Sequence, residues 1–159
     1  MNIEFKKALL PDEIDALVDF DRKVFHDFPD DIFTADDWDN FESYWMFVDG
    51  QKVGCSSVQH NVDFDEHKRS GYLWIANTAI LPEFQNRHFG TILTQWQIDY
   101  ARKRGFRVVV INMRESNVRI ITLSRNLGFK FRRIKQHYYS NPDEATVVMQ
   151  LDLANSRFG

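Results

Sequence analysis

The sequence predicts an α/β fold built on a mixed sheet. Two apolar segments, residues 72–80 and 106–111, are typical of strands buried on both faces. Between them, apolar residues recur at three- and four-residue spacing from Phe89 to Tyr100, as on one face of a helix. Strand, helix and strand in this order form a parallel crossover. We therefore expect two parallel strands joined by a helix in the middle of the chain.

The connection between the first of these strands and the helix points to chemistry. Residues 85–91 read Gln-Asn-Arg-His-Phe-Gly-Thr, a short turn with one glycine that opens directly into the helix. N–H groups at a helix N-terminus have no acceptor inside the helix and bind phosphate oxygens. The segment predicts a pyrophosphate site, although an ordinary turn that needs a glycine for packing explains the same residues.

Stop signals and turn residues define the elements that follow. Basic residues 102–104 and Gly105 end the central helix. Asn117 can cap a short helix over residues 118–127, which Gly128 closes. Two final strands, roughly 131–139 and 145–153, pair through an Asn-Pro-Asp turn.

The N-terminal part predicts one strand, helices and a hairpin. The strand begins at Ile3, and Pro11 is expected to start a helix over residues 11–25. Strands over residues 44–49 and 51–59 form a hairpin around an Asp-Gly turn. Residues 27–42 mix carboxylates with aromatic side chains. They either attract a cationic amine or form a solvated acidic helix whose aromatics face the core, and Thr34 with Asp37 resembles helix capping.

Length, composition and charge set the class of protein. At 159 residues with 43% apolar side chains, we expect a single domain over residues 1–159 with a full core. The net charge of −3 disfavours a nucleic-acid partner. Cys55 is the only cysteine, no signal-peptide core is present, and no apolar run approaches a membrane span. We predict a cytoplasmic protein without membrane partners, either a monomer or a homodimer.

The ordered motifs resemble a known family. Gln85 five residues before Gly90, then Asn117, then Leu123 with Gly128-Phe129 after a buried strand look like the acetyl-coenzyme A (acetyl-CoA) motifs of the GNAT family of N-acetyltransferases. The resemblance implies a GNAT-like mixed sheet of six to seven strands flanked by about four helices, with strands four and five parallel and splayed. The consecutive tyrosines before the last strand are similar to those of the RimI-like N-terminal protein acetyltransferases.

The resemblance also implies which residues bind the cosubstrate. Splayed strand four would hold the pantetheine arm through its backbone, and the loop would hold the diphosphate. The cofactor residues expected are Thr78, Ala79, Ile80, Gln85, Asn86, Arg87, His88, Phe89, Gly90, Thr91 and Asn117. His88 stands where the family has its first loop glycine, so a positive φ there would carry strain. It is either a phosphate or ribose neighbour or a neutral surface residue.

Two departures leave the catalytic groups open. Ser124 replaces the tyrosine thought to protonate the CoA thiolate, and Asn112 replaces the glutamate or histidine that RimI-like enzymes use as a base. The remaining candidates for proton transfer are Tyr138, Tyr139 and Glu115, with Ser124 as a weak donor. Core tyrosines with satisfied hydroxyls, and a solvent-facing Ser124, are the structural alternatives. Strand alternation would place one of the two tyrosines on each sheet face.

The segment before strand four is rich in titratable groups. His60, Asp63 and His67 could in principle hold a metal, but an exposed loop explains them better and we expect no metal site. The sequence thus predicts transfer of an acetyl group from acetyl-CoA to a primary amine, either a protein N-terminus or a small cationic amine. The alternatives are a non-catalytic acyl-CoA-binding module and a plain interaction domain.

Overall fold

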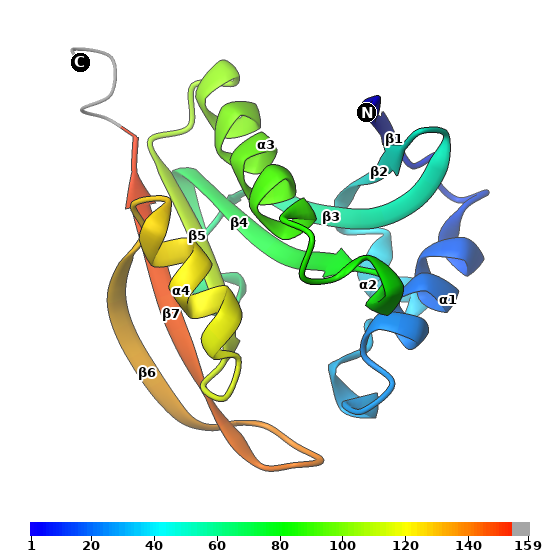
Figure 1. The fold of residues 1–159 in the computed structure, drawn as a ribbon. Helices are drawn as coiled ribbons and strands as arrows, with labels where there is room; N and C mark the ends of the chain where they lie inside the picture. The colour runs from blue at the N-terminus through cyan, green and yellow to red at the C-terminus, as the bar shows by residue number, and fades with distance from the viewer. Residues whose placement is uncertain (154–159) are drawn as a thin grey trace. The chain divides into compact units, whose positions relative to one another are not determined.

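The structure, a computed structural model, describes residues 1–153. Seven strands form one mixed sheet in the order β1-β2-β3-β4-β5-β7-β6, accompanied by four α-helices (Figure 1). The predicted mixed α/β fold is confirmed. The strands are β1 Ile3–Lys7, β2 Glu42–Val48, β3 Gln51–Val62, β4 Lys68–Ile80, β5 Val108–Arg114, β6 Lys130–Tyr139 and β7 Glu144–Asp152. The α-helices are α1 Ile14–Val24, α2 Ala35–Trp38, α3 Phe89–Lys103 and α4 Val118–Asn126, and short 3-10 turns are η1 Pro29–Asp31, η2 Phe64–Glu66 and η3 Pro82–Phe84.

Residue contacts group the chain into two compact units. The N-terminal unit contains residues 1–58 and 76–93, and the C-terminal unit contains residues 59–75 and 94–153. Strands β3 and β4 and helix α3 each contribute residues to both units. In the described part of the chain, no helix is long and apolar enough to cross a membrane.

In the N-terminal unit, β1 and β3 pair antiparallel with β2. The predicted hairpin around Asp49 and Gly50 is confirmed, and both residues have positive φ, 49° and 81°. Helix α1, however, begins at Ile14, so the prediction that Pro11 starts it is wrong. The reason is tertiary: Glu13 accepts a hydrogen bond from Trp45 Nε1 at 2.9 Å, which holds Glu13 at the N-cap position.

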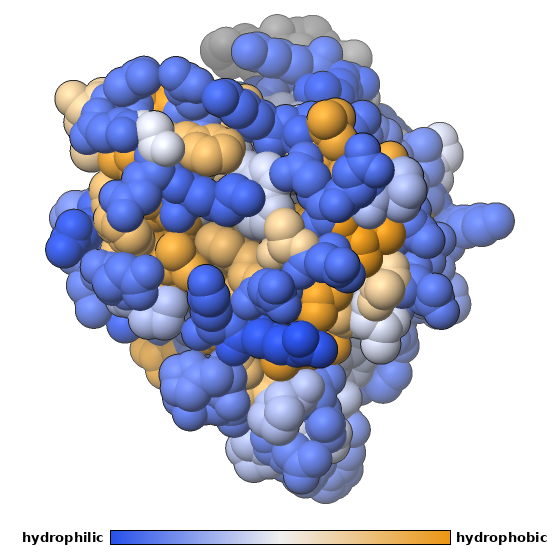
Figure 2. Space-filling model, turned by 90° about the vertical axis from the view of Figure 1, so that its right-hand side faces the viewer, coloured by the Kyte–Doolittle hydropathy of each residue, from blue (hydrophilic) through white to orange (hydrophobic). Residues whose placement is uncertain are grey.

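The acidic segment is organised by its aromatic side chains. Trp38 is fully buried and forms edge-to-face contacts with Phe33 and Phe41, with ring centroids 5.7 and 5.9 Å away. Thr34 and Asp37 form the predicted capping box at the start of α2. These aromatic side chains therefore face the core, as expected from the second interpretation of residues 27–42, an acidic helix with core-facing aromatics. On the side of the molecule that carries α1, the surface is largely hydrophilic, with hydrophobic side chains visible between (Figure 2).

In the C-terminal unit, β4 and β5 run parallel from Tyr72 opposite Val108 to Ile75 opposite Ile111, which confirms the predicted crossover. Strands β6 and β7 form the long hairpin drawn in orange and red (Figure 1). Strand β5 begins two residues later and ends three residues later than predicted. The sequence pattern missed its end because the last three residues include polar Asn112 and Arg114. Their side chains are hydrogen-bonded inside the fold, so an apolar pattern could not reveal them.

Candidate functional site

The end of β4 lies against β3 in the N-terminal unit. Leu81 N–H donates to the Val53 carbonyl at 2.9 Å. A Cβ on Gly54 would lie only 3.1 Å from the Ala79 carbonyl oxygen and 2.9 Å from Ile80 Cδ1. Glycine is thus what allows β3 to approach β4 here. The Ala79 and Ile80 side chains are buried, so polar recognition along this stretch would have to use the backbone.

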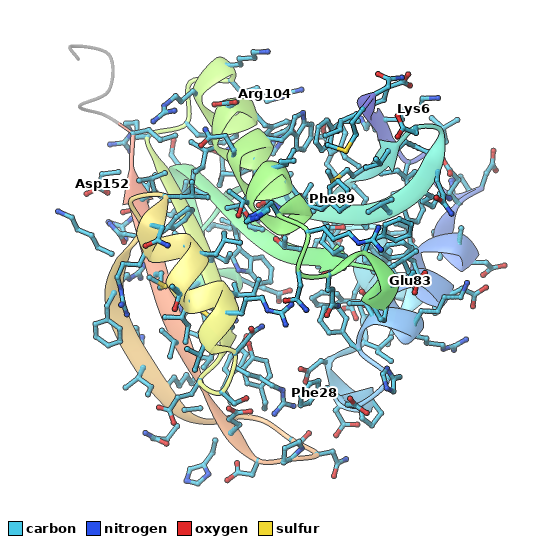
Figure 3. The ribbon with its side chains drawn as sticks, viewed as in Figure 1. Lys6, Phe28, Glu83, Phe89, Arg104 and Asp152 are labelled. Atoms are coloured by element: carbon cyan, nitrogen blue, oxygen red, sulfur yellow. The ribbon has the colours of Figure 1, made fainter. Side chains whose placement is uncertain are left out.

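The loop from Gln85 to Thr91 begins α3 in the predicted manner. Gln85 Nε2 donates to the Ile80 carbonyl at 3.0 Å, which ties the loop to the end of β4. Ile92 N–H donates to the His88 carbonyl at 3.1 Å, so α3 starts directly after His88. Figure 3 shows Phe89 at this first turn and Glu83 in the preceding η3. The geometry is that of a helix N-terminus presented by a short turn.

The backbone of this loop is left-handed at two residues that are not glycine. Asn86 has φ 64° and His88 has φ 68°. Asparagine tolerates this region because its side chain bonds locally, whereas histidine pays a steric cost of about 1–2 kcal/mol. His88 therefore adopts the conformation of the glycine it replaces, and the strain expected from the sequence is present.

Replacing His88 by glycine is expected to raise the free energy of unfolding by about 0.5–1 kcal/mol, because it removes this strain. Urea denaturation measures the change. The matched control is Arg87→Gly: Arg87 is an exposed neighbour without positive φ, and this change should instead lower stability by about 0.5–1 kcal/mol. Equal destabilisation by the two glycines would contradict a left-handed residue 88.

Helix α4 carries two predicted site residues. Asn117 is its N-cap, and Asn117 Oδ1 accepts from Ile120 N–H at 3.3 Å, so the predicted cap is confirmed. Ser124 is completely buried, which rules out the solvent-facing alternative for it. Its Oγ has no hydrogen-bond partner among the described residues. Ser124 therefore sits in the interior with an unsatisfied hydroxyl rather than at an open surface.

A hydrogen-bonded network in the C-terminal unit centres on Asn112. Trp74 Nε1 donates to Asn112 Oδ1 at 3.0 Å, and Asn112 Nδ2 donates to Tyr139 Oη at 3.2 Å and to Thr146 Oγ1 at 3.3 Å. Thr146 in turn donates to the Met113 carbonyl. A neutral amide does not accept a proton near neutral pH, so Asn112 holds the Tyr139 hydroxyl but cannot act as the glutamate or histidine base expected at this position from the resemblance.

The predicted alternation of the two tyrosines is wrong. The Tyr138 and Tyr139 rings contact each other edge to face, with centroids 4.9 Å apart. A register shift between Lys135 and Tyr139, with His137 at φ 56°, interrupts the alternation of β6. Burial, with smaller contributions from Tyr139 and nearby carboxylates, raises the pKa of Tyr138 to about 12. Tyr138 is thus a neutral phenol that packs on Phe64, whereas Tyr139 belongs to the polar network.

Arg114, which the sequence analysis did not single out, anchors the β6–β7 turn. Its guanidinium is buried and donates to the carbonyls of Ser140 and Pro142, both at 2.9 Å, and to Glu144 at 3.1 Å. It also lies 4.6 Å from the Tyr139 ring centroid. Burial raises the pKa of Glu144, but hydrogen bonds from Ser116 and Arg114 outweigh it and hold the pKa below its usual range. The available signal was a charged residue at the end of a mostly apolar strand.

The remaining candidates are Glu115 and the titratable residues that precede β4, of which His60 lies on β3. Glu115 directly follows β5, and its side chain is exposed. Asp63 accepts from Arg132 at 2.6 Å and from Arg69 at 3.1 Å, and His60 Nε2 lies 2.7 Å from Tyr100 Oη. Within residues 1–153, no group of His, Cys, Asp and Glu side chains is arranged to hold a metal ion.

Comparison with known proteins identifies the family. Residues 11–129 match the model of the acetyltransferase (GNAT) family. The chain belongs to the GNAT family. A curated relative, the ribosomal protein bS18-alanine N-acetyltransferase of Escherichia coli K12, is 32% identical over 80 residues, which cover 49% of this chain and 54% of that protein. The chain thus spans about half the length of this curated relative.

Solved GNAT structures share the fold over nearly the whole chain. The crystal structure of the E. coli ribosomal-protein-S18-alanine N-acetyltransferase has a TM-score of 0.78 at 20% identity, and the match covers 96% of this chain and 95% of that one. A Bacillus subtilis acetyltransferase in complex with CoA has a TM-score of 0.73 at 18% identity, with coverage of 96% and 99%. At these identities the likeness establishes the GNAT fold.

Proposed function

We propose that this chain transfers an acetyl group from acetyl-CoA to the amino terminus of a protein or peptide. The observation that carries the proposal is the loop Gln85–Thr91, which is tied to the β4 end through Gln85 and turns through left-handed Asn86 and His88 into α3. A helix N-terminus presented in this way suits a diphosphate. A CoA complex among the fold neighbours and the match to the family model support the same ligand.

The proposed chemistry is direct attack. The amine nitrogen bonds to the acetyl carbon, the carbon–sulfur bond breaks, the amine gives up a proton and the sulfur takes one. Backbone groups of Thr78–Ile80 would hold the pantetheine arm and the thioester. Tyr139 is the proposed proton donor to the sulfur, because its hydroxyl is oriented by Asn112 and Thr146. Positioning of the two substrates can supply much of the rate. An asparagine at residue 112 in place of a glutamate or histidine base would therefore lower turnover without abolishing it.

The proposed acceptor follows from the relatives and from the charge of the N-terminal unit. Two relatives are named for N-terminal or alanine acetylation, the bS18-alanine enzyme and N-alpha-acetyltransferase 30 of Schizosaccharomyces pombe. Exposed carboxylates at Asp27, Asp30, Asp36 and Asp39 would attract a cationic amine. A small polyamine remains the second acceptor class, and a cytoplasmic site of action is part of the proposal.

Calorimetry with acetyl-CoA and thiol release with a peptide panel test the proposal. The parent chain should bind acetyl-CoA and release CoA thiol with at least one amino-terminal peptide. Thr91→Glu, which places a carboxylate in the first turn of α3, should weaken binding at least tenfold while the helix itself tolerates the charge. Gln95→Glu, with the same charge change one turn later, is the matched control and should bind like the parent.

Three results would count against the proposal. No binding of acetyl-CoA, or equal binding by Thr91→Glu and the parent, would reject the cofactor site. Tight binding without thiol release across peptides, polyamines and aminoglycosides would favour a non-catalytic acyl-CoA-binding module. The buried Ser124 and the amide at Asn112 are the observations that keep that second function open.

A further inference from the structure

A buried carboxylate joins three segments of the N-terminal unit. Asp21 lies on α1 and is 1% exposed. Its Oδ1 accepts from Asn77 Nδ2 of β4 at 2.9 Å, and its Oδ2 accepts from Phe33 N–H at 3.4 Å. Phe33 lies two residues after η1 and packs on Trp38 and Phe41. Asp21 is thus the polar link between α1, the acidic segment and β4.

Among residues 1–153, no cation compensates the charge of the Asp21 carboxylate. In the described residues, no Lys, Arg or His forms an ion pair with it, although Arg22 and Lys23 follow it on exposed positions of α1. The titratable groups that face it are the Asp31 carboxyl of η1 and the buried Cys55 thiol of β3. A buried charge held only by two neutral donors is costly, and proteins retain such groups where function needs them.

The contribution of Asp21 to the free energy of unfolding depends on pH. Burial raises the pKa of Asp21 to about 6, although hydrogen bonds from Asn77 and Phe33 lower it and the Asp31 carboxylate raises it further. The folded chain therefore holds this proton more tightly than the unfolded chain. Its contribution to stability is full below the ordinary aspartate pKa and is lost as the pH rises through about 6. At neutral pH the carboxylate is ionised and accepts both hydrogen bonds.

We propose that Asp21 is a positioning residue for the amine acceptor: its carboxylate holds the segment of residues 28–33 against Asn77. The inference rests on the proposed function, because Asn77 directly precedes the backbone of Thr78–Ile80 and residues 28–33 belong to the proposed acceptor side. Both are in the same compact unit. An ordered acceptor segment matters for acceptor binding and not for acetyl-CoA binding, so the two Michaelis constants separate the roles.

The test compares Asp21→Asn with Asp19→Asn, a matched loss of one carboxylate at an exposed position of the same helix. An asparagine presents an N–H to one of the two donors, so one hydrogen bond is lost. At pH 7.5 we expect the acceptor KM of Asp21→Asn to exceed that of Asp19→Asn about fivefold, with acetyl-CoA KM equal within twofold.

Hydrogen exchange at the Phe33 amide gives a readout that needs no catalysis. Exchange should be about tenfold faster in Asp21→Asn than in Asp19→Asn at pH 7.5. If Asp21→Asn does not fold, Asn77→Ala removes the donor instead of the carboxylate and takes its place in both measurements.

The outcomes separate this inference from the proposed function. Equal exchange rates of the Phe33 amide in Asp21→Asn and Asp19→Asn would show that Asp21 does not hold residues 28–33 in place. Faster exchange at Phe33 with the same acceptor KM in Asp21→Asn and Asp19→Asn at pH 7.5 would overturn the positioning role. If the parent transfers acetyl to no acceptor, the proposed function fails and the positioning role fails with it, while the exchange ratio still decides whether Asp21 holds the segment.

Discussion

Replacing Tyr139 by phenylalanine is expected to lower kcat about 100-fold with little change in either KM, since a positioned proton donor contributes in this range. The Tyr139 hydroxyl is the group that Asn112 Nδ2 and Thr146 Oγ1 hold, at 3.2 and 3.3 Å. Its loss removes the donor and leaves the ring packed against Tyr138. Steady-state release of CoA thiol, measured with saturating peptide and acetyl-CoA, reports the change.

Tyr138→Phe is the matched control for this prediction. Tyr138 is half-buried, packs on Phe64 at 5.4 Å and has a pKa raised to about 12, chiefly by burial. Tyr138 is a poor partner for proton exchange near neutral pH, so the kcat of Tyr138→Phe should stay within about threefold of that of the parent. Equal turnover in the parent and both phenylalanine variants would remove tyrosine from the mechanism and leave solvent as the proton donor.

Replacing Arg114 by methionine is expected to lower the free energy of unfolding by about 3–5 kcal/mol, the usual cost of breaking a buried ion pair by removing one partner. The guanidinium satisfies the carbonyls of Ser140 and Pro142 and the carboxylate of Glu144, and methionine can replace none of these hydrogen bonds. Urea denaturation followed by tryptophan fluorescence measures the loss.

Arg119→Met, at an exposed position of α4, controls for the loss of one positive charge and should stay within about 0.5 kcal/mol of the parent. A loss below about 1 kcal/mol for Arg114→Met would show that the β6–β7 turn does not depend on this residue. Because Arg114 also lies over the Tyr139 ring, any folded fraction of the variant should turn over more slowly as well.

Local sequence signals were sufficient for the elements and for the loop that begins α3. Caps, glycines and apolar periodicity located α3, α4 and the hairpin turns, because these signals act within a few residues of the chain. They failed where a distant side chain decides the local backbone. Trp45 fixes the start of α1 through Glu13, and the bulge in β6 brings Tyr138 and Tyr139 together instead of separating them.

The polar interior shows the same division between sequence and tertiary structure. Asn112 and Ser124 could be recognised as departures from the family pattern. Only the folded chain shows that Asn112 holds Tyr139 and that the buried Ser124 hydroxyl has no hydrogen-bond partner within residues 1–153. Asp21 and Arg114 carried no motif at all. Hydrogen bonds between residues far apart in the chain, such as Asp21 with Asn77, depend on packing in three dimensions. The sequence by itself therefore determined the family, the order of the elements and the loop that begins α3, whereas only the tertiary structure decided which buried polar groups meet.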